Sequence, residues 1–172
     1  TDSDANGGDD LGPSWSLPVT GRIQVDDGGT DPVDRFVAIF GGGLDPANDA
    51  VGNFIYMVDV ETGKVLYKRE TAAAVPSQPA AVDSDRNGYL DLVYVGDVDG
   101  HLYKINMSEI PTLVADTVTN DLVVSEDDWN PLEIFDAEGR SIFFSPTDST
   151  RCSAIIGIEP ICCSSMPRII AC

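Results

Sequence analysis

The sequence has few basic residues, a single histidine and no long apolar run. Its 172 residues include 10 Lys and Arg against 29 Asp and Glu, which gives a formal net charge of −19. Ordinary nucleic-acid binding is excluded, because a phosphate backbone needs a basic surface. No apolar run approaches the ~18 residues that a membrane-spanning helix needs. An acidic excess of this size favours bound divalent cations, an extracellular setting, or both.

The motifs of common enzymes are also missing. The chain has no G-x-S-x-G, no glycine-rich phosphate loop with a lysine, and no H-E-x-x-H. We interpret His101 as an exposed strand residue, and Trp15 and Trp129 as packing residues rather than sugar-stacking platforms. The chain is therefore expected not to be an enzyme.

Cysteine is absent from the first 151 positions and then occurs four times, at Cys152, Cys162, Cys163 and Cys172. No histidine and no C-x₂-C pair accompanies them, which argues against zinc and haem. We expect disulfides formed in an oxidising compartment, within one chain or between chains, with free thiols as the alternative. The adjacent pair Cys162 and Cys163 bonds more easily to two separate partners than to itself.

Short β-rich runs take the place of helical periodicity. Three glycine-containing turns, Asp59–Gly63, Gly96–Gly100 and Asp136–Gly139, each connect two such runs as hairpin loops do. This pattern predicts antiparallel all-β structure, with strands over residues 35–40, 54–60, 64–68, 90–95, 101–105, 132–135 and 141–144.

A long-period repeat is superimposed on these runs. A proline closely preceded by serine occurs at Pro18, Pro79 and Pro146, at intervals of 61 and 67 residues. These intervals suit four-stranded propeller blades with loop insertions, since simple blades take ~40–50 residues. We predict an acidic N-terminal segment over residues 1–15, a partial β-propeller over 16–150 and a cysteine-containing tail over 151–172. The blades would cover residues 16–70 and 77–135, with a third beginning at 141.

This blade count predicts an incomplete structure. A closed propeller needs ~4–8 blades, whereas this chain holds two to three. Open sheet edges pair readily with other chains. The chain is therefore expected to be a piece of a longer protein or to assemble with copies of itself.

Residues 83–91 have the spacing of a calcium-binding loop. Oxygen ligands at positions 1, 3, 5 and 9, a backbone carbonyl at position 7 and a glycine at position 6 can enclose one hard cation. Oxygen donors without sulfur or imidazole select calcium over transition metals. Because the loop lies between predicted strands and has Tyr94 at position 12, it is not an EF-hand; the alternative is a solvated turn. The predicted ligands are Asp83, Asp85, Asn87, Asp91 and the carbonyl of Tyr89.

The same spacing occurs at the N-terminus and predicts a second calcium loop, with a disordered acidic tail as the alternative. A third acidic cluster, Asp26–Asp31 with Asp34, is less regular, and we interpret it as a solvated loop. The predicted N-terminal ligands are Asp2, Asp4, Asn6, Asp10 and the carbonyl of Gly8.

A family resemblance extends over residues 11–147. The segments that carry it are Leu11–Ile23, Phe36–Leu44, Gly52–Lys64 and Asp91–Ile105, with a weaker part in Leu132–Thr147. In this order they resemble the C-terminal propeller of PilY-type proteins, which are tip-associated adhesins and biogenesis factors of bacterial type IV pili. Individual pieces such as the Asp…Thr–Gly hairpin are shared with quinoprotein-like propellers, so the order of the segments carries the resemblance.

The resemblance implies a secreted or cell-surface, calcium-binding propeller that acts by binding. In the family a calcium loop of this kind is linked to control of pilus extension and retraction, a role that would fall here on Asp83, Asp85, Asn87 and Asp91. The large N-terminal adhesive region and most blades of such proteins are missing, and the cysteine tail has no counterpart.

The sequence thus predicts an extracellular calcium-binding module with a structural or adhesive role. Its expected partners are copies of itself or pilus and cell-surface proteins. One alternative is a subunit of a calcium-stabilised filament or oligomer, and another is a fragment of a quinoprotein-type enzyme.

Overall fold

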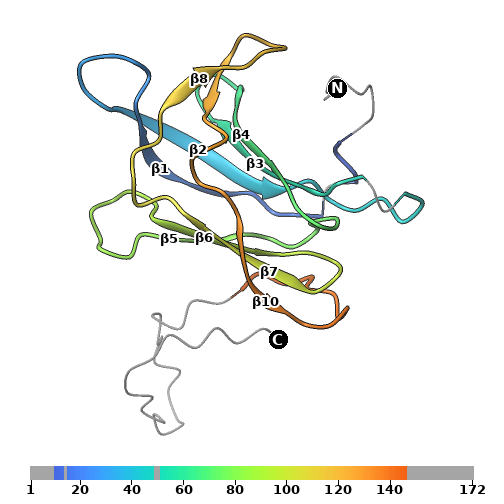
Figure 1. Cartoon of the computed structure of the whole chain (residues 1–172). Coiled ribbons are helices and arrows are strands. Elements are labelled where there is room, and N and C mark those ends of the chain that lie inside the picture. Colours follow the sequence, from blue (N-terminus) through green and yellow to red (C-terminus); the bar gives the residue numbers. More distant parts are fainter. Residues whose placement is uncertain (1–9, 14, 49–50, 147–172) are drawn as a thin grey trace, which may run out of the picture.

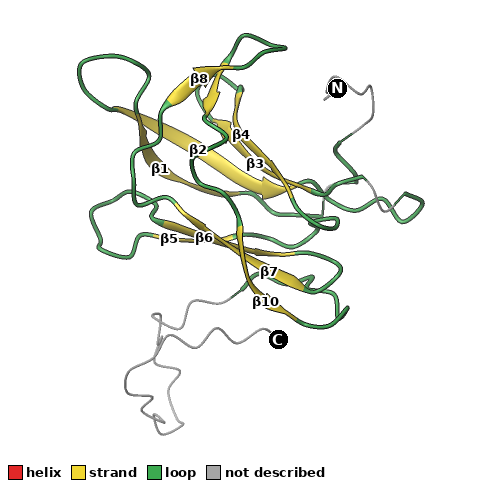
Figure 2. Ribbon diagram, viewed as in Figure 1, coloured by secondary structure: helices red, strands yellow, loops and turns green. Residues whose placement is uncertain are grey.

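The computed structural model describes residues 10–13, 15–48 and 51–146 of the chain. Over these residues the chain forms ten strands, and Figure 2 shows strands and loops alone. None of the described segments is a helix long and apolar enough to cross a membrane. The prediction of antiparallel all-β structure is confirmed.

The first sheet is a meander of four antiparallel strands in the order β1-β2-β3-β4. In β2 every second residue from Val37 onward is buried, as expected for a strand with one face on a core. The sheet occupies the interval predicted for the first blade. Its strands are β1 (Val19–Val25), β2 (Val33–Gly41), β3 (Phe54–Asp59) and β4 (Val65–Glu70).

The second sheet has the order β10-β7-β6-β5 and is also antiparallel throughout. Between β7 and β10 the chain leaves this sheet and forms the hairpin β8-β9, which packs against β4 of the first sheet (Figure 1). The strands are β5 (Ala80–Val82), β6 (Leu92–Gly96), β7 (His101–Asn106), β8 (Leu113–Ala115), β9 (Leu122–Val124) and β10 (Leu132–Asp136).

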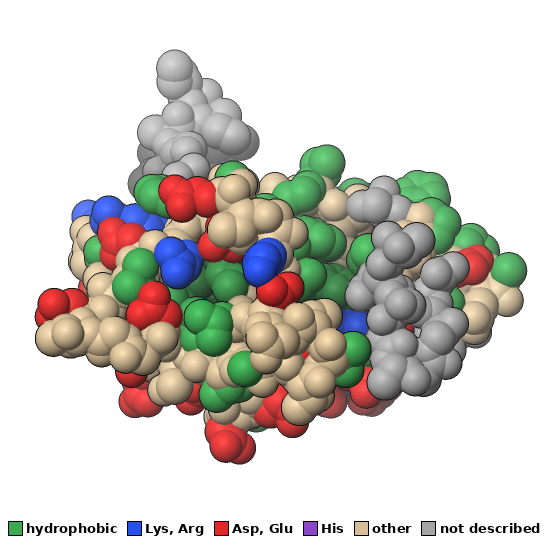
Figure 3. Space-filling model, turned by 90° about the horizontal axis from the view of Figure 1, so that it is seen from above, with side chains coloured by type: hydrophobic (Ala, Val, Ile, Leu, Met, Phe, Trp, Pro, Cys, Tyr) green, Lys and Arg blue, Asp and Glu red, His purple; other side chains and the backbone are tan. Residues whose placement is uncertain are grey.

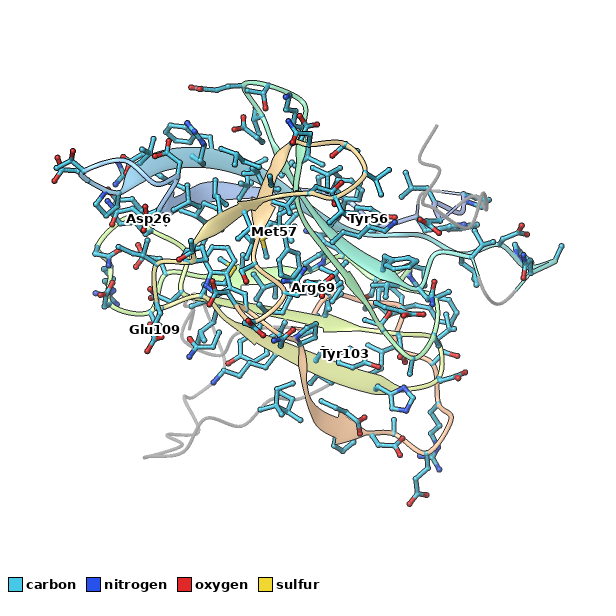
Figure 4. The ribbon with its side chains drawn as sticks, turned by 45° about the horizontal axis from the view of Figure 1, so that its top comes forward. Asp26, Tyr56, Met57, Arg69, Tyr103 and Glu109 are labelled. Carbon is cyan, nitrogen blue, oxygen red and sulfur yellow. The ribbon has the colours of Figure 1, made fainter. Side chains whose placement is uncertain are left out.

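The two sheets enclose one apolar core. Figure 4 shows Met57 of the first sheet and Tyr103 of the second on either side of Arg69. Burial of each large aliphatic side chain contributes about 1.5–3 kcal/mol. The fully buried aliphatic residues include Ile23, Val25, Val37, Ile39, Ile55, Val75, Val93, Val95, Leu102 and Ile105.

The β8-β9 hairpin closes one side of this core. Arg69 donates hydrogen bonds to the backbone carbonyls of Val124, Ser125 and Asp128. Trp129 is buried, and its backbone carbonyl accepts the Tyr67 hydroxyl at 2.7 Å. The packing role predicted for Trp129 is therefore confirmed, whereas Trp15 is exposed and the same prediction for it is wrong.

The serine–proline repeat has a structural counterpart in two matching hydrogen bonds. The hydroxyl of Ser16 accepts the backbone N–H of Gly41, at the end of β2. The hydroxyl of Ser77 likewise accepts the N–H of Gly96, at the end of β6. Ser16 also donates to the carbonyl of Ser77, so that the two repeats are joined directly.

Glycine is required at the ends of β2 and β6 by close packing. A Cβ on Gly41 would lie 2.2 Å from the carbonyl oxygen of Val75, and one on Gly96 would lie 2.3 Å from Ile142. Val75 and Ile142 each precede a repeat proline, Pro79 or Pro146, by the same number of residues. The second and third repeats therefore each pack the segment before their proline against the preceding sheet.

The predicted strands differ from the structure at several points. Residues 141–144 form no strand, so the Asp136–Gly139 turn does not connect two strands, whereas the other two predicted turns do. Four strands were not predicted, namely β1, β5, β8 and β9. The segment boundaries at residues 15 and 150 stay predictions, and the cysteines lie outside the described residues.

The close approach at Gly41 leads to a stability prediction. Gly41→Ala should lower the free energy of unfolding by roughly 1–3 kcal/mol, because the new methyl group meets backbone that cannot rotate away. Urea denaturation measures the change. The control is Gly29→Ala, where the nearest atom is a side-chain oxygen of Asp27 at 3.1 Å. Equal stability of the two variants would contradict the proposed constraint.

Candidate metal centre

The loop 83–91 connects β5 to β6 at one end of the second sheet (Figure 1). Its last residue, Asp91, is anchored by the backbone: its N–H donates to Val82, and its carbonyl accepts the N–H of Met107 at 2.6 Å. The side chain of Asp91 is thereby fixed at the edge of the core. Residues 84–88 are exposed, whereas Asp83, Tyr89 and Leu90 are partly buried, and Leu90 packs against the core.

Three of the predicted ligands come together in this loop. Carboxylate oxygens of Asp83, Asp85 and Asp91 all lie within 4.8 Å of one another. At that separation two negative charges repel by roughly 1 to 4 kcal/mol, depending on the effective dielectric constant. Among the described residues, no lysine or arginine forms an ion pair with any of the three. The residues present fit a hard divalent cation such as calcium.

Backbone N–H groups inside the loop hold the carboxylates in place. Asp83 accepts the N–H groups of Asn87 and Gly88, at 3.1 and 2.8 Å. Asp85 accepts the same Asn87 N–H at 3.0 Å. Arg86 and Gly88 have φ of 63° and 91°, the left-handed turn that curls the backbone around the cluster. Gly88 supplies this conformation without steric cost, as the sequence predicts.

The other two predicted ligands lie in the same loop. The side-chain amide of Asn87 donates to Asp85, which places it beside the carboxylates, while its oxygen accepts the N–H of Tyr89. The ring of Tyr89 turns away from the cluster, and its hydroxyl donates to Asp34 at 3.0 Å. A role for Asn87 and for the Tyr89 carbonyl as ligands stays a prediction.

Arg22 of β1 contacts the loop 83–91 at Gly88 and Tyr89. Its guanidinium lies 4.2 Å from the centre of the Tyr89 ring, and it also donates to the carbonyl of Gly88. An ion pair with Asp34 at 3.6 Å completes the arrangement. These contacts tie the loop of the second sheet to the first sheet.

Hydrogen bonds from Ser84 lower the pKa of the Asp91 carboxyl group. One oxygen of Asp91 accepts both the hydroxyl and the N–H of Ser84, each at 2.6 Å. The hydroxyl bond is the main cause that lowers the pKa of Asp91, and desolvation opposes it. Asp91 is therefore ionised, as a metal ligand has to be.

Four of the five predicted N-terminal ligands, Asp2, Asp4, Asn6 and Gly8, lie outside the described residues. The fifth, Asp10, is buried and forms an ion pair with Lys68. The second calcium loop stays a prediction.

The acidic cluster at residues 26–34 behaves as a capped turn. Asp26 and Asp27 accept the backbone N–H groups of Gly28 and Gly29, and Asp27 also pairs with Arg35.

Figure 3 shows acidic side chains around much of one face of the molecule, with few basic ones.

A second cluster of metal-ligating residues was missed by the sequence analysis. His101, Glu133 and Asp136 offer ligand atoms within 4.8 Å of one another. The side chain of His101 is 20% exposed and is bonded to Asp97, so its interpretation as an exposed strand residue is wrong. The hydrogen bond with Asp97 is the largest cause that raises the pKa of His101. No local motif reveals this cluster, because its members come from two separate strands.

The geometry defines an all-β domain in which a carboxylate loop joins two strands of an antiparallel sheet. This domain is similar to the C-terminal domain of the pilus protein PilY1. The type IV pilus biogenesis factor PilY1 of Pseudomonas aeruginosa (strain PAO1) is 28% identical over 103 residues. A PilY1 homolog of Xylella fastidiosa is 27% identical over 114 residues. No protein-family model matches the chain.

The alignments include most of this chain but little of the relatives. They take in 57% and 58% of this chain, yet only 8% of the Pseudomonas protein and 7% of the Xylella protein. The crystal structure of the Pseudomonas aeruginosa PilY1 C-terminal domain matches 83% of this chain and 31% of its own, with 22% identity and a TM-score of 0.48. The sequence alignments confirm the resemblance to PilY-type proteins.

The hydrogen bonds of Asp91 lead to a prediction for its titration. In calcium-free buffer, Ser84→Ala should raise the pKa of Asp91 toward its ordinary value, because the largest stabilising contact of the carboxylate is lost. Since the folded pKa lies below the unfolded one, the stabilisation is present at neutral pH and is lost as pH falls through the folded pKa. Carboxyl ¹³C NMR measures the midpoint.

Asp116 is the internal control, because its pKa is lowered by the N–H of Thr119 instead. An unchanged Asp91 midpoint in Ser84→Ala would contradict the prediction.

Proposed function

We propose that the chain is an extracellular calcium-binding β-propeller module with a structural or adhesive role related to type IV pilus proteins. The observation that carries the proposal is the cluster of Asp83, Asp85 and Asp91. These residues lie in one loop whose backbone N–H groups donate hydrogen bonds to Asp83. The sequence relationship to PilY1, a type IV pilus biogenesis factor, supplies the cellular setting. Cell-surface location and action by binding, without catalysis, are parts of this proposal.

Calcium would stabilise the domain in two ways, by neutralising the carboxylates of the loop and by holding the two ends of the loop together. It would neutralise the repulsion within the carboxylate cluster and connect the start of the loop at Asp83 to Asp91, just before β6. Through Arg22 and Tyr89 the ordered loop would also hold the first sheet. The ion would thereby stiffen the junction between the two sheets.

The propeller architecture is supported by two features of the described chain. Both four-stranded sheets are meanders, and a serine hydroxyl bonds to the glycine at the end of the second strand in each. Repetition of the same contact in consecutive sheets is typical of blades that follow one another around an axis.

Calcium binding at the loop can be tested by thermal unfolding. At about 100 times its Kd, calcium should stabilise the parent chain by about 2.7 kcal/mol, which is roughly 5–10 °C in Tm for a chain of this size. Asp83→Ala with Asp85→Ala should abolish the shift. Calorimetry in calcium and in chelator measures both.

The matched control is Glu126→Ala with Asp127→Ala, which removes the same charge from another exposed loop. This variant should keep the full calcium shift. If the parent melts at the same temperature in calcium and in chelator, the proposed site does not exist.

A second candidate function is favoured by the exposed edge of the second sheet. All five residues of β10 are exposed, and Leu132 and Phe135 are 63% and 52% accessible. Phe143 and Phe144 add exposed aromatic surface further along the chain. Open edges with apolar side chains favour pairing with other chains. On this evidence the chain would be the subunit of a calcium-stabilised filament or oligomer.

Self-association through β10 can be measured by sedimentation velocity, with electron microscopy for regular polymers. Phe135→Lys should weaken association roughly tenfold or more, since a charge replaces an aromatic side chain that the association would bury. Val60→Lys is the control, because Val60 is 58% exposed in a turn of the first sheet. A parent chain that sediments as a monomer in calcium would exclude the filament function.

A further inference from the structure

At the end of the second sheet opposite the calcium loop, the imidazole of His101 faces two carboxylates. His101 begins β7, and Glu133 and Asp136 belong to the neighbouring edge strand β10. One ligand atom from each lies within 4.8 Å of the other two. Because loops at opposite ends of an antiparallel meander alternate, this cluster and the loop 83–91 cannot share an ion.

A β-bulge brings the two carboxylates onto the same face. Residues three apart on a regular strand point to opposite faces of the sheet. Here the pairing shifts between Glu133 and Phe135, so that Glu133 lies opposite Tyr103 and Asp136 lies opposite His101. His101 and Tyr103 are two residues apart and share a face, and their two partners therefore share it as well.

The imidazole is oriented by a carboxylate outside the cluster. Asp97 is fully buried, and one of its oxygens lies 2.9 Å from Nδ1 of His101 and also accepts the hydroxyl of Tyr103. Its other oxygen accepts the N–H groups of Asp99 and His101. A carboxylate so placed accepts a hydrogen from Nδ1, which leaves the lone pair on Nε2. This is how histidines that bind metals are commonly held.

The two carboxylates beside the imidazole are available to a cation. Among the described residues, no lysine or arginine forms an ion pair with Glu133 or Asp136. Asp136 accepts the N–H of Glu138 through one oxygen, which leaves the other for a ligand. Among the described residues the two carboxylates of the cluster therefore have the imidazole of His101 beside them but no lysine or arginine as an ion-pair partner.

We propose that His101, Glu133 and Asp136 form a second metal site, selective for a divalent transition ion such as zinc. One imidazole nitrogen and two carboxylate oxygens are a ligand set that zinc accepts, with water in the remaining position. Calcium prefers oxygen ligands, in larger number, and fits the loop 83–91 better. A bound ion would fasten the edge strand β10 to β7 and to the turn that contains Asp97.

The single histidine of the chain makes a direct test practicable. Zinc is titrated into the full chain in saturating calcium, with any free thiols alkylated, and the ¹⁵N resonances of the imidazole are followed. We expect the Nε2 resonance to shift with one equivalent of zinc, while Nδ1 keeps its proton. Glu133→Gln and Asp136→Asn should each weaken zinc binding roughly tenfold or more, since loss of a mere supporting contact already costs about 10–100-fold.

Glu138→Gln is the matched control, because it removes a neighbouring charge of the same turn that is outside the cluster. It should bind zinc as the parent does. Asp97→Asn, checked for folding by circular dichroism, should weaken zinc about 10–100-fold and disturb the tautomer. An imidazole that zinc leaves unchanged, or Glu133→Gln and Asp136→Asn variants that bind zinc as tightly as the parent, would overturn the proposal.

Discussion

The interaction on which this structure depends is the hydrogen bond from a backbone N–H group to an aspartate at the end of a strand. A chain with 29 acidic and 10 basic residues cannot neutralise its carboxylates by ion pairs alone. Asp59, Asp97 and Asp116 instead each accept two N–H groups from the turn that follows. The same bonds satisfy turn amides that no strand can pair. Part of the surplus charge is thereby used to cap the turns that follow β3, β6 and β8.

The two proposed metal sites extend this arrangement. In the loop 83–91 the carboxylates are close in sequence, and N–H groups of the loop gather them. At His101 the buried Asp97 holds the imidazole, and a bulge in β10 supplies the carboxylates. Oxygen ligands alone suit calcium, whereas an imidazole suits a transition ion. Two ions of different chemistry would thus act on opposite ends of one sheet, each where negative charge exceeds what backbone donors can satisfy.

The features that were predicted correctly from the sequence are those encoded locally. The convergence of Asp83, Asp85 and Asp91 in a loop between two strands and the turns at Asp59 and Gly96 depend on a few consecutive residues, so spacing alone reveals them. Strand β1 was missed because Gly21 and Arg22 interrupt its apolar pattern, and β5 because it has only three residues. Residues 141–144 look like a strand, but Ile142 is used to pack on Gly96. The His101 cluster depends on pairing across the β8-β9 insertion and on a bulge, neither of which has a local signature.

Val75 packs on Gly41 and Ile142 packs on Gly96, so the same contact follows each of the two four-stranded sheets. In both cases the glycine ends a second strand, a serine hydroxyl bonds to its N–H, and an aliphatic residue before a repeat proline lies against it. Stability in such a chain comes largely from contacts between neighbouring repeats. Ile142 occupies the place after the second sheet that Val75 occupies after the first. Both contacts join a segment that follows a sheet to the end of the second strand of that sheet.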